Sequence, residues 1–155
     1  MRFLLILSIL GVLAIFGTLP RENILITDFE GKDYGDWQAT GNAFGPGPAQ
    51  GTLPNQMPVS GFLGHGLVNS YFQGDTATGT LTSPEITLNR KYLNFLIGGG
   101  HHPNETCINL LVDGKVVRTE TGRDSERLDW ASWELGKLEG SKRDCNTVED
   151  QRSVV

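Results

Sequence analysis

A polar loop in the second half of the chain carries side chains that could contact a ligand. His101, His102 and Asn104 follow the glycine run Gly98–Gly100. Imidazole and amide groups can hydrogen-bond to sugar hydroxyl groups, and imidazoles can also bind a metal ion. Adjacent histidines on a strand would face opposite sides, so only a loop would allow them to chelate, and then loosely. A sugar-contacting loop, a metal site and a plain solvent-exposed loop all remain open.

Carboxylates gather near the first turn of the chain. Asp28 and Glu30 would point to the same side of an extended segment, and Asp33 and Asp36 follow shortly after. Calcium takes six to eight oxygen ligands, so we consider a calcium ion at Asp28 and Glu30. The alternative is a solvated acidic turn, because the spacing of an EF-hand loop is absent.

Three tryptophans could stack on a sugar ring or could pack in the core. We group Trp37 with the loop residues His101, His102 and Asn104 as the candidate carbohydrate-binding set. No catalytic residues are assigned. The chain has no Gly-x-Ser-x-Gly elbow, no two-Cys, two-His zinc spacing and no phosphate-binding glycine loop followed by a helix.

The elements that must position these residues are strands. Tyr92–Ile97 and Thr106–Val112 are apolar at successive positions, which predicts strands covered on both faces. Twenty glycines and seven prolines separate short apolar runs, as in an all-β fold. We expect a β-sandwich. Further strands are predicted at Ile24–Phe29, Trp37–Thr40, Val59–Leu63, Leu67–Phe72, Thr78–Thr82, Glu85–Leu88 and Leu128–Leu135.

The clearest local signal is a hairpin. Asp113-Gly114 is a favoured pair for a type I′ turn, whose two central residues both have φ > 0. The turn joins Thr106–Val112 to a partner strand over Lys115–Thr121. Gly98–Gly100 is expected to end regular pairing after Tyr92–Ile97.

The N-terminus has the pattern of a secretory signal peptide. One positive charge precedes an apolar run over Phe3–Phe16, which is short for a membrane span. Residues 1–17 are therefore expected to direct secretion, or export to the periplasm or cell surface. An uncleaved anchor is the alternative, and it is the one case in which we expect a membrane partner.

The charge distribution argues against a nucleic-acid partner, and the positions of the two cysteines argue against a disulfide. The net charge of −5 is spread along the chain, whereas nucleic-acid binding requires clustered Lys and Arg, so no nucleic acid is expected. Cys107 lies in an apolar strand and Cys145 in a polar tail, and we expect no disulfide between them.

The order of these motifs is similar to a known family. Residues 26–88, ITDFEGKDYGDW through SPEITL, and residues 92–122, YLNFLIGGGHHPNETCINLLVDGKVVRTETG, resemble the N-terminal accessory domain of secreted bacterial levanases, members of glycoside hydrolase family 32. The resemblance extends over about Ile26–Glu139. It implies a jelly-roll β-sandwich like galactose-binding domains, spanning residues 24–139. It also implies a place ahead of a propeller that cleaves fructans such as levan and inulin.

The chain departs from that family in two ways. The Asn-Asp-Pro-Asn, Arg-Asp-Pro and Glu-Cys catalytic motifs are missing, and residues 140–155 replace the segment that closes the family's domain. We therefore expect a non-catalytic fragment whose partner is a fructan polysaccharide or an adjoining catalytic domain. A purely structural domain and a stand-alone secreted interaction protein remain alternatives. No cofactor beyond calcium is considered. The tail, residues 140–155, is polar and lacks apolar alternation, so we expect it to be aberrant or disordered and to supply no strand.

Overall fold

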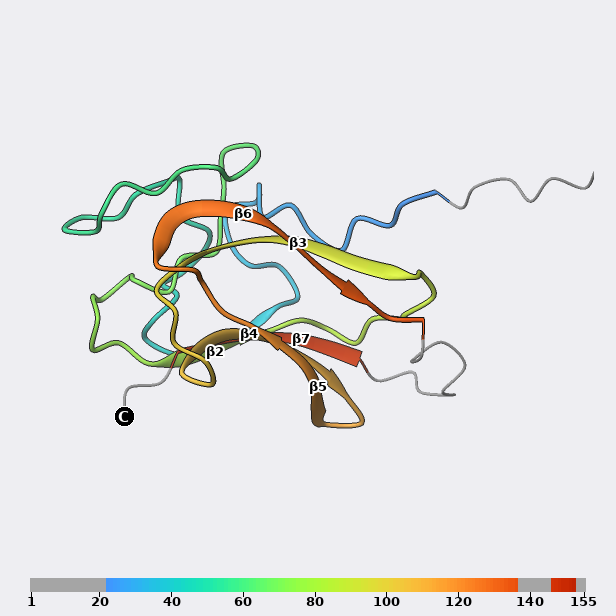
Figure 1. Ribbon diagram of the computed structural model, residues 1–155. Coiled ribbons are helices and arrows are strands. Elements are labelled where there is room, and N and C mark those ends of the chain that lie inside the picture. Colours follow the sequence, from blue (N-terminus) through green and yellow to red (C-terminus); the bar gives the residue numbers. More distant parts are fainter. Residues whose placement is uncertain (1–21, 137–145, 153–155) are drawn as a thin grey trace, which may run out of the picture.

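The computed structural model describes residues 22–136 and 146–152, and this part of the chain is all-β (Figure 1). Within it, no helix is long and apolar enough to cross a membrane. The strands form two antiparallel sheets, one in the order β1-β2-β7-β4-β5 and the other pairing β3 with β6. The strands are β1 (Gln38–Gly41), β2 (Gly79–Thr82), β3 (Tyr92–Gly99), β4 (Thr106–Val112), β5 (Lys115–Glu120), β6 (Ser125–Glu134) and β7 (Asn146–Arg152). The predicted all-β class is confirmed.

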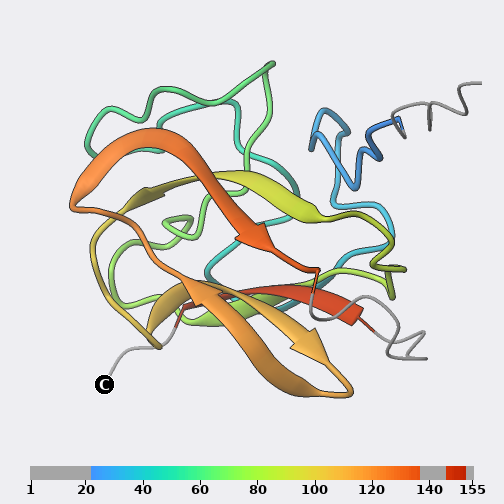
Figure 2. The same ribbon diagram turned by 45° about the vertical axis from the view of Figure 1, so that its right-hand side comes forward.

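The two sheets lie as two layers, with β6 arching over the larger sheet (Figures 1 and 2). Between them, Leu110 of β4 packs with Trp133 and Leu135, and Phe95 of β3 joins this cluster. Side chains along β6 alternate between the two faces of its sheet, since Trp133 is 6% exposed whereas Trp130 is 61% exposed. A second cluster, formed by Tyr34, Ala43, Phe44, Ala77 and Leu81, lies beneath the long loops.

The β4–β5 hairpin is confirmed. Asp113 and Gly114 have φ of 52° and 69°, as a type I′ turn requires. Val112 pairs with Lys115 directly beside the turn. The glycine run does not end the pairing where predicted, because β3 continues to Gly99, which pairs with Ser125, and the β3–β6 register only shifts between Ile97 and Gly99.

β3 is less enclosed than the sequence predicts. It pairs with β6 and belongs to a different sheet from β4, and Tyr92 and Asn94 are exposed. The prediction of a strand covered on both faces is therefore wrong for β3. The same prediction agrees better with β4, since Cys107, Leu110 and Val112 are buried.

The tail contradicts the expectation that it supplies no strand. Asn146–Arg152 forms β7, which pairs with β2 on one side and β4 on the other. Sheet pairing uses backbone N–H and C=O groups, and these are present whatever the side-chain pattern. Two strand edges that would otherwise be open, those of β2 and β4, are covered by one polar segment. Cys145 lies outside the described residues.

Ile24–Phe29 is not a strand, contrary to prediction. Its backbone is turned locally, because Phe29 N–H donates to Thr27 Oγ1 (3.2 Å), Glu30 N–H donates to Asp28 Oδ1 (3.1 Å), and Phe29 has a φ of 56°. Such side-chain-to-backbone bonds compete with sheet pairing. Three further predicted strands are also irregular: Val59–Leu63, Leu67–Phe72 and Glu85–Leu88. The first two contribute isolated bridges, from Ser60 to Arg127 and from Leu67 to Ala49.

Candidate functional site

The His-bearing loop joins β3 to β4 and is held by its backbone. His101 N–H donates to Asp124 Oδ1 (2.8 Å), and His102 N–H donates to Thr121 Oγ1 (3.1 Å). His101 Nδ1 lies 3.2 Å from the Gly122 carbonyl oxygen. Both imidazoles and the side chain of Asn104 are exposed, so all three predicted loop residues share one exposed loop at the end of the sandwich.

Trp37 lies in the interior and is not part of the exposed loop. Its half-buried indole contacts both core clusters, and Phe29 packs edge-on against it with ring centroids 5.1 Å apart. A tryptophan packed in this way helps to join the long loops to the sandwich. Its contribution to sugar binding remains a prediction.

Glu30 is used to hold a neighbouring loop. Its Oε1 atom accepts hydrogen bonds from the backbone N–H groups of His65 (2.7 Å) and Gly66 (2.9 Å). These two bonds, with that of Gly66 the stronger influence, lower the pKa of Glu30 below its ordinary value. A side chain on Gly64 or Gly66 would overlap Glu30 or the Phe29 carbonyl, so the close approach depends on glycine at both positions.

The neighbouring Asp28 caps the turn by accepting the Glu30 N–H. Across residues 22–136 and 146–152, no three His, Cys, Asp or Glu side chains converge as a metal site would require. Calcium at Asp28 and Glu30 thus remains a prediction made from the sequence alone.

A second candidate surface, not expected from the sequence, is the outer face of the β3–β6 sheet. Cross-strand pairing sets Tyr92 beside Glu134, Asn94 beside Ser132 and Leu96 beside Trp130, and paired residues share a face. Tyr92 is 49% exposed and Trp130 is 61% exposed. Four residues along the strands separate the two rings, which is about 13 Å at ~3.3 Å per residue.

Polar groups lie between these two aromatic rings and beside Tyr92. Ser132 Oγ donates to Asn94 Oδ1 (2.7 Å), and Lys91 Nζ lies 5.0 Å from the centroid of the Tyr92 ring and 3.8 Å from Glu134 Oε1. Two exposed aromatic rings, with hydroxyl and amide groups between them and charged groups beside Tyr92, can stack on sugar rings and hydrogen-bond to their hydroxyls. We call Lys91, Tyr92, Asn94, Trp130, Ser132 and Glu134 the aromatic face.

The sequence indicates in part which residues lie on the aromatic face. Parity along Leu128–Leu135 separates Trp130 from Trp133, and the structure confirms the separation. The pairing of β6 with β3 rather than with a neighbour in sequence could not be read from the chain.

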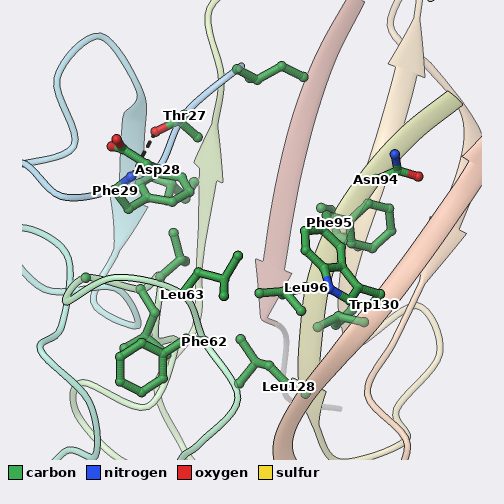
Figure 3. Close-up of a pocket in the computed structure, with 18 of the residues that line it drawn as sticks. Thr27, Asp28, Phe29, Phe62, Leu63, Asn94, Phe95, Leu96, Leu128 and Trp130 are labelled. Carbon is green, nitrogen blue, oxygen red and sulfur yellow. Dashed lines mark hydrogen bonds between the residues drawn. The ribbon is translucent and has the colours of Figure 1, made fainter. Parts of the chain in front are cut away.

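Beside the aromatic face is a cavity of about 440 Å³ (Figure 3). One wall is formed by Leu25–Phe29 with Phe62 and Leu63, and the opposite wall by β3 with Leu128 and Trp130. Figure 3 shows Leu63 and Leu96 projecting into the space from opposite sides. The lining is mainly apolar, and we call this space the β3 groove.

The chain is similar to a protein from Aspergillus rugulosus named "Putative glycosyl hydrolase ecdE". The two are 40% identical over 129 residues, which make up 81% of this chain and 18% of that protein. The chain is therefore related to a protein that carries a glycosyl hydrolase name, and it matches less than a fifth of that protein's length. No protein-family model matches the chain. No solved structure matches it either.

Proposed function

We propose that the chain is a non-catalytic accessory module of an exported fructan hydrolase, and that its aromatic face binds polysaccharide. The module would be a jelly-roll sandwich like galactose-binding domains, as the resemblance to glycoside hydrolase family 32 implies. Catalysis would belong to another part of the longer protein, because the three catalytic motifs of that family are missing from this chain.

The aromatic face is the observation that carries the proposal. Trp130 is exposed on a strand whose other tryptophan is buried, so its indole is available for stacking at little cost to the core. Tyr92 offers a second ring, and Asn94 and Ser132 offer hydrogen-bonding groups between the two. The relative named a glycosyl hydrolase supports a carbohydrate as ligand.

The His101–Asn104 loop is a secondary contact in this proposal. Its side chains are exposed, and its backbone is held by Thr121 and Asp124, so little ordering would be needed on binding. Export through residues 1–17 belongs to the same proposal. N-terminal sequencing of the protein recovered from culture medium would test that step.

Affinity electrophoresis in gels containing levan or inulin tests the binding. Trp130→Ala should weaken retardation by about tenfold or more, as expected when a contact worth about 1.5–3 kcal/mol is lost. His101→Ala should have a smaller effect. Val116→Ala is the matched control, since Val116 is an exposed apolar residue on β5, in the other sheet. Equal mobility of the wild type and Trp130→Ala would overturn the assignment of the aromatic face.

The same preparations also test the non-catalytic part of the proposal. Incubation with levan, inulin or sucrose should release no reducing sugar. Release that persists through further purification would contradict it.

A further inference from the structure

The β3 groove follows an unpaired strand edge. All residues from Leu93 to Gly98 line it, although successive residues of a strand point to opposite faces. A cavity can contact both faces of one strand only where it passes along that strand's edge. Within residues 22–136 and 146–152, the backbone of β3 has hydrogen-bonding partners only in β6, so its second edge opens into the groove.

The opposite wall is a locally turned segment that has no sheet partner in the described part of the chain. Leu25–Phe29 lines the groove at every position, and no backbone hydrogen bond joins it to another described segment. The side chains of Leu25 and Leu63 are largely exposed. Two unpaired stretches of backbone therefore border one apolar space.

The lining determines what can enter. Asp28 is the one residue of charged type among the described lining residues. The volume of about 440 Å³ corresponds to ~15 waters at their share of the liquid, and these would sit against apolar walls. An occupant must offer apolar side chains, and to pair with β3 it must also offer backbone N–H and C=O groups. An extended peptide that is apolar at successive positions meets both requirements, and adding such a strand to a sheet edge is a common mode of recognition.

We propose that the β3 groove accepts one extended, apolar segment of the polypeptide that accompanies this module in a longer protein, and that this segment pairs with β3 as a third strand of its sheet. The inference rests on the proposed function as an accessory module. It is supported by the length of the relative, since 82% of that protein lies outside the matched region and could supply the segment.

The test uses the intact chain and synthetic peptides of about 12 residues, enough for one strand. The peptides tile the part of the A. rugulosus relative outside the matched region, and their binding is measured by fluorescence polarisation. We expect a small set of peptides with consecutive apolar residues to bind. Leu63→Asp should weaken this binding at least tenfold. Val116→Asp, an equally drastic change at an exposed apolar site on β5, should leave it unchanged.

Hydrogen exchange shows whether a bound peptide pairs with β3. Amide protons of Tyr92–Gly99 that point away from β6 should exchange at least tenfold more slowly in the complex. Binding without protection of β3, binding insensitive to Leu63→Asp, or no binding by any peptide would each overturn the inference. So would two other results: a dimer that Leu63→Asp dissociates, or β3 protection in the free chain that is lost on Leu10→Glu in the apolar N-terminal segment.

Levan binding is measured on the same samples and keeps the two proposals separate. If levan binding persists and depends on Trp130 while no peptide binds, the groove inference fails and the sugar-binding module stands. If peptides bind at β3 and levan does not bind, the sugar-binding function fails and the groove inference stands.

Discussion

The two sheets of this molecule contain equally apolar strands but bury them differently. β4 lies between β7 and β5, and its Leu110 is fully buried. Within the described residues β3 has a paired neighbour on one side only, and none of its residues is fully buried. The position of a strand within the sheets, more than its apolar content, decides how much of its side-chain surface is buried.

The difference divides the molecule into a stabilising part and a part available for binding. The five-stranded sheet supplies fully buried side chains such as Leu81 and Leu110. The β3–β6 sheet covers that core with its inner face, and it exposes the aromatic face and the β3 groove. Substitutions in the two parts should therefore differ in their effect on the free energy of unfolding.

The largest contrast is expected between two tryptophans of β6. Trp133 packs edge-on against Phe95, with ring centroids 4.6 Å apart, so Trp133→Ala should lower the free energy of unfolding by about 3–5 kcal/mol. Trp130→Ala should change it by only about 0.5 kcal/mol, as at other surface sites. Urea unfolding followed by circular dichroism measures both. Similar losses for the two variants would contradict the assigned faces.

The next contrast compares leucines of the two sheets. Leu110→Ala in β4 should lower the free energy of unfolding by about 2–5 kcal/mol, because it leaves a cavity in the core. Leu96→Ala in β3 should cost only about 1 kcal/mol, since a half-buried leucine loses about half of its burial free energy. Denaturant unfolding of both variants is the measurement. A Leu96→Ala loss as large as that of Leu110→Ala would show that β3 is covered in the free chain.

A smaller effect is expected at the hairpin of the larger sheet. Gly114 has a φ of 69°, a conformation that costs a residue with a side chain about 1–2 kcal/mol. Gly114→Ala should lower the thermal unfolding midpoint accordingly. Gly136→Ala is the control, because that glycine has open space around it and does not adopt positive φ. An unchanged midpoint for Gly114→Ala would argue against the type I′ turn.

The smallest effect concerns pH and the Glu30 contact with the loops. The pKa of Glu30 is lower in the folded chain than its ordinary value of 4.5. The stabilisation from its ionised form is therefore complete above that value and is lost as the pH falls through it toward the folded-state pKa. Unfolding midpoints measured from pH 7 down to about pH 3 should fall less steeply for Glu30→Gln than for the wild type. Asp36→Asn, which removes a nearby exposed charge, is the control, and parallel curves for the wild type and Glu30→Gln would contradict the prediction.

Much of the candidate site could be anticipated only as a set of residue types. The exposed loop with His101, His102 and Asn104 was found from its polar run between apolar strands. The packing of Trp37, which we grouped with this loop, could not be predicted, because whether a tryptophan packs or projects depends on neighbours such as Phe29, which contacts it only in the folded chain. The aromatic face required the register that brings Leu96 beside Trp130, and no local pattern encodes that register.

Features that depend on near neighbours along the chain could be predicted from the sequence. These are the all-β class, the turn at Asp113-Gly114 and the alternation that separates Trp130 from Trp133. Each follows from φ preferences or from side-chain parity within a few residues. Such local preferences act wherever the segment finally lies.

The pairing of the strands, and which strand edges stay open, depend on the complete fold. The polar segment Asn146–Arg152 lies between β2 and β4, whereas the apolar segment Ile24–Phe29 has no sheet partner among the residues that the structure describes. The physical reason is that sheet pairing joins backbone groups, which every residue except proline carries in the same form. Side-chain patterns therefore indicate where a strand could form, whereas a partner strand brought close by the rest of the fold decides whether it does.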